Sequence, residues 1–135
     1  MSPSRILLDT SAYTHLRGGD ERVAEAVAAA RLVHLSVITL GELEAGALLG
    51  KRTADNRAAL EDFLSAPFVS ELPVTKEVAR VYGRLFAALR KAGTPIGTND
   101  IWIAATTAEA GAHLITFDQD FARIAGLDAT ILSLR

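Results

Sequence analysis

Carboxylates carry most of the chemistry that this sequence offers. Several of them stand where an apolar segment ends or a helical pattern begins, and long stretches of chain separate them. Carboxylates that the fold brings together repel one another, and a hard divalent cation such as Mg²⁺ or Mn²⁺ removes that repulsion. A cation held in this way can activate water against a phosphodiester. The candidate acids are Asp9, Glu42, Asp100, Asp118 and Asp120.

Each acid also has a purely structural interpretation. Acidic residues favour the first turn of a helix, where free N–H groups and the helix dipole stabilise them. Thr39 and Glu42 match a capping box. Asp100 suits a first helical turn, and Asp118 suits the cap of a short helix. Asp9 is harder to explain in this way, because it ends an apolar strand, where burial of an unpaired charge is unfavourable.

The elements that must position these acids alternate between strands and helices. This alternation predicts βαβ units and a mainly parallel sheet covered on both faces, which is a three-layer α/β/α fold. Ligands of such sheets bind beyond the carboxyl ends of the strands, and all of the acids are expected at that edge, where no histidine is expected. We expect strands at 6–8, 32–37, 68–72, 113–117 and 130–134, and helices at 21–30, 39–49, 54–64, 75–90, 98–110 and 120–125.

Composition narrows the possible sites. The chain of 135 residues is expected to form one domain, 1–135, with 50% hydrophobic residues to supply its core. It has no cysteine, which excludes thiolate zinc sites and disulfides, and its three histidines are far apart in the sequence. The net charge of −2 argues against nucleic-acid binding by bulk charge. No export signal or membrane span is expected, which indicates the cytoplasm.

Four segments together resemble the signature motifs of PIN-domain proteins, and in particular the VapC toxins of type II toxin–antitoxin systems. The resemblance extends over nearly the whole chain, in the order typical of the family. Each segment alone is a weak signal, whereas the four together are specific. The segments are 6–11 (ILLDTS), 39–43 (TLGEL), 99–105 (NDIWIAA) and 115–121 (ITFDQDF).

The resemblance implies a metal-dependent endoribonuclease that cuts structured RNA such as tRNA or ribosomal RNA. It implies Mg²⁺ or Mn²⁺ as the cofactor, inhibition by a VapB antitoxin whose C-terminal segment reaches the active site, and a homodimer. Asp118 is preferred to Asp120 because it directly follows the expected strand. The implied catalytic and metal-binding acids are Asp9, Glu42, Asp100 and Asp118, with Thr10, Thr116, Asn99 and Asp120 in support.

Basic side chains offer two candidate contacts for RNA phosphates. Arg80, Arg84 and Lys91 share one stripe of an expected helix, and they form either a phosphate-binding surface or a solvated face. A second candidate surface combines the Lys51–Arg52 pair with Arg57.

Two short helices expected from the sequence carry more apolar side chains than their own packing requires. These side chains suggest either core packing or a groove for an antitoxin helix. These are Leu48, Leu49, Leu60, Phe63 and Leu64, and Trp102 likewise suits core or dimer packing.

Two other classes of function occur on similar architectures. Phosphotransfer domains of similar architecture need a late lysine or an Asp-x-Asp motif, but the last lysine is Lys91, and Thr10 and Ser11 follow Asp9. A non-catalytic PIN-fold module that binds RNA or protein remains the alternative.

Overall fold

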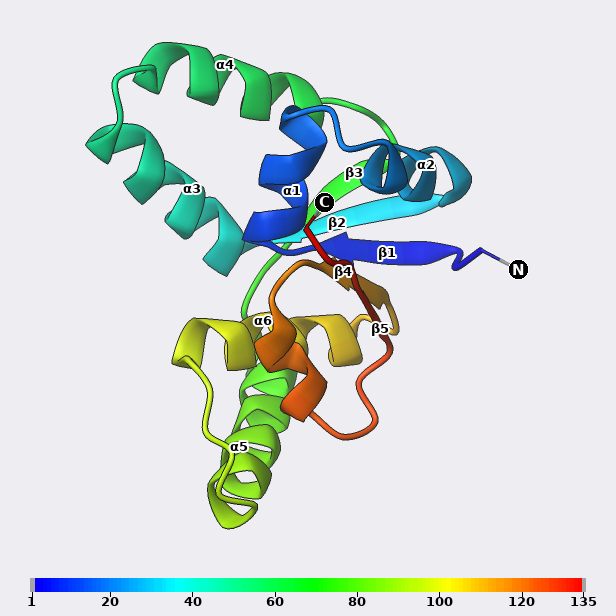
Figure 1. Ribbon diagram of the computed structural model, residues 1–135, viewed down its shortest axis with the longest axis vertical. Helices are drawn as coiled ribbons and strands as arrows, with labels where there is room; N and C mark the ends of the chain where they lie inside the picture. The colour runs from blue at the N-terminus through cyan, green and yellow to red at the C-terminus, as the bar shows by residue number, and fades with distance from the viewer. Residues whose placement is uncertain (1, 135) are drawn as a thin grey trace.

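The computed structural model describes residues 2–134, so Met1 and Arg135 of the expected domain lie outside the described residues (Figure 1). Its centre is a five-stranded sheet in the order β3-β2-β1-β4-β5, with every neighbouring pair parallel. The strands are β1 (Arg5–Leu8), β2 (Leu32–Ser36), β3 (Val69–Leu72), β4 (His113–Thr116) and β5 (Ala129–Ile131).

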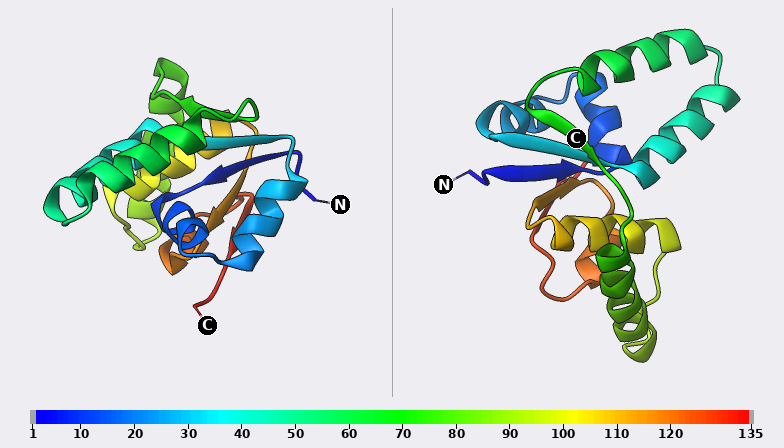
Figure 2. Two further views of the ribbon diagram at one scale, coloured as in Figure 1. Left: turned by 90° about the horizontal axis from the view of Figure 1, so that it is seen from above. Right: turned by 180° about the vertical axis from the view of Figure 1, so that it is seen from behind.

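Helices cover both faces of this sheet, which confirms the expected three-layer α/β/α fold. Helices α1 to α4 lie on one side, and α5 and α6 lie on the other (Figures 1 and 2). The α-helices are α1 (Thr10–Arg17), α2 (Glu21–Ala29), α3 (Val37–Leu49), α4 (Thr53–Leu64), α5 (Lys76–Lys91) and α6 (Thr98–Glu109), and a 3-10 helix, η1 (Gln119–Arg123), follows β4. No helix among residues 2–134 is long and apolar enough to cross a membrane.

Strand β1 shows how the sequence builds the two cores. Side chains of a strand alternate between the faces of the sheet. Ile6 and Leu8 pack in the cluster that α1 and α2 cover, whereas Leu7 packs with Leu89 and Ile101 on the opposite face. The side chains of Ile6, Leu7 and Leu8 are each at most 1% exposed. The consecutive apolar residues of this strand are therefore the signature of a central strand buried on both faces.

The strand order places a topological switch point beside β1. The chain runs outward from β1 through β2 to β3, and then returns across the sheet through α5 and α6 to β4 on the other side of β1. The carboxyl ends of β1 and β4 are therefore adjacent, and the connections after them diverge. Asp9 and Asp118 follow these two strands, so the topology brings both acids to the position where such sheets bind ligands.

The structure differs from the sequence-based expectations mainly at the start of helices. Helix α1 is not expected from the sequence, because its cap is Asp9 and its few apolar side chains give a weak helical pattern. Helix α3 is expected to begin at Thr39, but it begins at Val37, and Ser36 caps it through the amide of Ile38. The last strand is also shorter than expected and ends at Ile131.

Candidate functional site

Asp9 is the buried centre of the acidic edge. It is 4% exposed and caps α1, accepting a hydrogen bond from the amide of Ala12 at 2.8 Å. The hydroxyl of Ser11 donates to Oδ1 of Asp9 at 2.7 Å, and the hydroxyl of Thr116 donates to Oδ2. Burial nevertheless outweighs these hydrogen bonds and raises the pKa of Asp9, with a smaller contribution from the charge of Asp118.

Glu42 enters the site from α3, held by two polar neighbours. The hydroxyl of Thr10 donates to its Oε1, and the amide of Asn99 donates to its Oε2 at 3.4 Å. Because α3 begins at Val37 under the cap of Ser36, Glu42 lies in the second turn of the helix. The capping box with Thr39 is therefore wrong, since Thr39 is fully buried inside the helix. Glu42 has no capping role that would explain its position.

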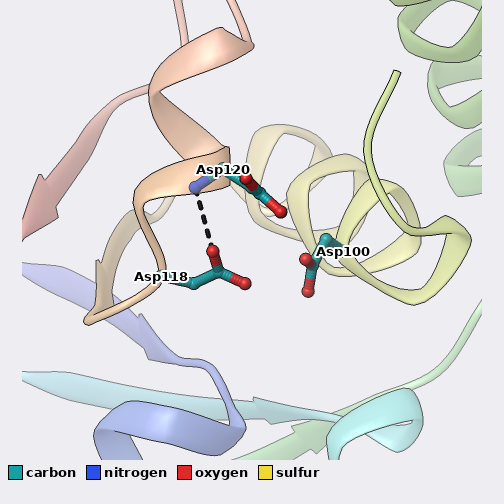
Figure 3. A group of neighbouring side chains, drawn as sticks. All are labelled: Asp100, Asp118 and Asp120. Atoms are coloured by element: carbon teal, nitrogen blue, oxygen red, sulfur yellow. Dashed lines mark hydrogen bonds between the residues drawn. The ribbon is translucent and has the colours of Figure 1, made fainter. Parts of the chain in front are cut away.

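Asp100, Asp118 and Asp120 form a group of neighbouring carboxylates. One carboxylate oxygen from each lies within 4.8 Å of the other two. Asp100 extends from the first turn of α6, and the other two extend toward it from the start of η1 (Figure 3). Asp118 also caps η1 by accepting a hydrogen bond from the amide of Asp120 at 2.9 Å. The capping interpretation of Asp118 is thus correct, and the same carboxylate still faces Asp100.

The electrostatics of this edge favour a bound cation. The pKa of Asp100 is raised to about 7, chiefly by burial and also by the negative charges of Asp118, Asp9 and Glu42. A carboxyl group that stays half-protonated near neutral pH for want of positive charge is a fitting ligand for a hard cation. The edge therefore has the oxygen donors and the excess negative charge that a divalent ion requires, and it could hold one.

The structure places all four predicted acids at one edge, but they do not form one tight group. Asp9 and Glu42 act on Asp100 through their charges but lie outside the group of Asp100, Asp118 and Asp120. Asp120 belongs to that group, while its carboxylate also lies 3.6 Å from the guanidinium of Arg123.

Ser11 also contacts the acidic edge, although the sequence did not single it out as a candidate site residue. Its hydroxyl contacts Asp9 and accepts a hydrogen bond from the backbone amide of Phe117 at 2.9 Å. The Phe117 ring stacks on the ring of His15 at 3.8 Å, so a histidine does lie close to this edge, contrary to expectation. A hydroxyl residue two positions after a strand-ending acid was the available signal.

The candidate phosphate contacts differ in their surroundings. Arg80, Arg84 and Lys91 are exposed on α5. Arg52 and Arg57, in contrast, already pair with Asp55 and Glu44.

A groove of about 290 Å³ begins beside the acids and runs between α1, α3 and α4. Thr10 and Glu42 form one end of it, and Leu60 lies along its wall. Leu48 and Leu49 are exposed, at 62% and 90%, whereas Phe63 and Leu64 pack partly buried against the core. Trp102 stacks on Tyr82 at 3.8 Å and packs with the α5–α6 core, as the packing interpretation predicted.

Comparison with known proteins agrees with this geometry. The family model described as "PIN domain" matches residues 6–127. Ribonuclease VapC5 of Mycobacterium tuberculosis is 34% identical over 125 residues, covering 93% of this chain and 91% of that protein.

Two solved complexes show the same fold. VapBC-1 from nontypeable Haemophilus influenzae superposes with a TM-score of 0.82 at 32% identity, covering 94% of this chain and 97% of that one. VapBC-5 from Mycobacterium tuberculosis, described as a member of the VapBC family of toxin–antitoxin systems, gives 0.75 at 32% identity and covers 98% and 100%. Fold, acidic edge and sequence similarity lead to one conclusion: this chain belongs to the PIN-domain family and, within it, to the VapC proteins.

Proposed function

We propose that this chain is the toxin of a VapBC-type system and that it cleaves structured RNA, such as tRNA or ribosomal RNA, as an endoribonuclease that depends on Mg²⁺ or Mn²⁺. The observation that carries the proposal is the group of carboxylate oxygens from Asp100, Asp118 and Asp120 that lie within 4.8 Å of one another. The raised pKa of Asp100 shows how unfavourable this arrangement is without a cation. The naming of the similar VapC5 protein as a ribonuclease supports the choice of reaction.

In this proposal the acids divide the work of holding the ion. Asp9, Glu42, Asp100 and Asp118 would be its ligands. Asp120, which has a carboxylate oxygen within 4.8 Å of oxygens of Asp100 and Asp118, would assist Asp118. When bound, the ion supplies Lewis-acid chemistry, because it lowers the pKa of water and offsets charge on the phosphate. The number of ions, one or two, depends on how many of these oxygens act as ligands at once.

Side chains around the acids keep them oriented. Thr10 and Asn99 each hold one oxygen of Glu42, and Thr116 holds one oxygen of Asp9. Oriented ligands need little rearrangement when an ion binds, which strengthens binding. A carboxylate of the group also orients the attacking water or accepts its proton.

The remaining proposals concern the partners. Arg80, Arg84 and Lys91 are free of ion pairs among residues 2–134, so they are better placed to contact RNA phosphates than Arg52 and Arg57 are. A VapB-type antitoxin would lie in the groove between α1, α3 and α4, because this groove leads to Thr10 and Glu42. We also propose a homodimer that acts in the cytoplasm, where the RNA substrates are.

The decisive experiment compares cleavage of total RNA by the wild-type chain and by Asp9→Asn, with Mg²⁺ and with EDTA. We expect EDTA to abolish cleavage and Asp9→Asn to remove most of it, because the variant loses a charged ligand but keeps an oxygen that can cap α1. Asp62→Asn, at an exposed position on α4, is the matched control and should retain full activity. Wild-type cleavage by Asp9→Asn would refute the assignment. RNA binding without cleavage would favour the non-catalytic module.

A further inference from the structure

We propose that the hydroxyl of Ser11 is a positioning group of the acidic site, which holds Asp9 and the segment carrying Asp118 at a fixed separation. This inference rests on the proposed function, because it concerns the geometry of the acids that would hold the ion. Ser11 lies in the first turn of α1, and the segment that it contacts follows β4. The two parts of the chain meet only through the folded sheet.

The polarity of the hydrogen bonds follows from the chemistry of the carboxylate. Ionised Asp9 can only accept hydrogen bonds, so the single proton of the Ser11 hydroxyl must point to Oδ1, at 2.7 Å. The lone pairs of the Ser11 hydroxyl oxygen are then free to accept the amide proton of Phe117, at 2.9 Å. One atom therefore connects Asp9, which directly follows β1, with the backbone that leads to Asp118.

Thr116 completes the arrangement in the same way. Its hydroxyl donates to Oδ2 of Asp9 and accepts the amide proton of Asp118 at 3.0 Å. The two hydroxyl oxygens lie 3.4 Å apart and hold both oxygens of one carboxylate and two consecutive backbone amides. Oδ1 also receives the amide of Ala12, whereas Oδ2 has a single donor among residues 2–134. Oδ2 thus keeps the greater capacity to bind a cation.

The ring of Phe117 fixes the remaining freedom of this segment. It stacks on His15 at 3.8 Å, and the guanidinium of Arg22 lies over the ring at 5.5 Å. Arg22 also donates to the carbonyl of Ser133, which ties the C-terminal segment to the same point. With the ring held by α1 and α2, the Phe117 amide is kept directed at Ser11. Removing the Ser11 hydroxyl would leave that amide without its partner and free the backbone before Asp118.

The test measures Mn²⁺ affinity by titration calorimetry and amide hydrogen exchange at Phe117 by NMR, both on the purified full chain. We expect Ser11→Ala to weaken Mn²⁺ binding about tenfold, the effect typical of losing a group that orients a ligand. The Phe117 amide should exchange faster in the same variant. Ser11→Thr keeps the hydroxyl, so its Mn²⁺ affinity and its exchange rate at the Phe117 amide should both match the wild type.

Thr14→Ala is the matched control, because Thr14 is exposed on the same helix and its hydroxyl bonds only the carbonyl of Thr10 among residues 2–134. It should leave both values unchanged. Ser11→Cys fills similar space while weakening both hydrogen bonds, so it tests the proposal when the alanine variant does not fold.

Two results would overturn the inference alone: a wild-type Mn²⁺ affinity in Ser11→Ala, or a loss of affinity in Thr14→Ala equal to that in Ser11→Ala. A wild-type chain that binds no Mn²⁺ overturns it together with the proposed metal dependence. A chain whose Mn²⁺ affinity depends on Ser11 but which cleaves no RNA supports the role of Ser11 and refutes only the nuclease activity.

Discussion

Replacing Asp100 by asparagine should make the metal-free protein more stable at neutral and alkaline pH. The side chain is half-buried, and its pKa is raised to about 7, first by burial and then by the charges of Asp118, Asp9 and Glu42. Ionising it in the folded state is therefore unfavourable. Asparagine has nearly the same shape and no charge, so it removes this penalty.

The sign and size of the effect follow from the pKa difference between the folded and unfolded states. In the unfolded chain the pKa of Asp100 is near its ordinary value of 3.8, so between pH 4 and pH 7 the folded state binds more protons. Stability from this group is full below pH 4 and falls as the pH rises through 7. The pKa difference corresponds to about 4 kcal/mol. Solvent screening reduces this figure for a half-buried group, and we expect about 2 kcal/mol.

The assay is urea unfolding of the wild-type chain and Asp100→Asn in EDTA at pH 4, 6 and 8. The two should have similar free energies of unfolding at pH 4, and the variant should be more stable by about 2 kcal/mol at pH 8. Other groups that titrate in this range are common to both proteins, so the difference between them isolates Asp100. Asp62→Asn, at an exposed position on α4, should follow the wild type throughout.

Mg²⁺ extends the same test. It should stabilise the wild type more at pH 8 than at pH 5, because Asp100 must lose its proton to act as a ligand. Mg²⁺ should stabilise Asp100→Asn less than the wild type at both pH 5 and pH 8. If the wild type and Asp100→Asn lose equal stability between pH 4 and pH 8, Asp100 is not in a repulsive environment. The argument for a cation at this edge would then also fail.

Three further predictions concern other parts of the molecule. Leu114→Ala, at a fully buried position on β4, should lower the free energy of unfolding by about 3 kcal/mol, whereas Leu49→Ala, at a position 90% exposed, should change it by less than about 0.5 kcal/mol in urea unfolding. Burial lowers the pKa of His34, so the stability that neutral His34 contributes is present above pH 6.5 and is lost as the pH falls. His34→Asn should therefore reduce the fall in melting temperature at acid pH. A fall equal to that of the wild type would contradict this prediction. Arg84→Ala should weaken RNA binding, measured by filter retention in EDTA, and lower its salt dependence, while unchanged binding would assign the exposed α5 stripe to a solvated face.

The local pattern of this sequence was sufficient to predict most elements. Helix α5 is a good example, because Thr75 caps it and Gly93 follows its end with a φ of +72°. Helix α1 was missed because its sequence is mostly polar, and its cap, Asp9, was already assigned as the end of a strand. The capping-box pattern predicts Thr39 as the start of α3, but Ser36 caps the helix and Thr39 is fully buried in its first turn.

Residue types at short spacing are enough to predict the alternation of strands and helices, the apolar core and the identity of the acids. How these acids meet depends on the tertiary fold. The crossover from β3 to β4 sets Asp118 beside Asp100, and folding brings Ser11 within reach of Phe117. The pKa of Asp100 is likewise a tertiary property, since it arises from burial and from charges that lie far away along the chain. A sequence lists the carboxylates, but their repulsion exists only at the distances that the folded sheet imposes.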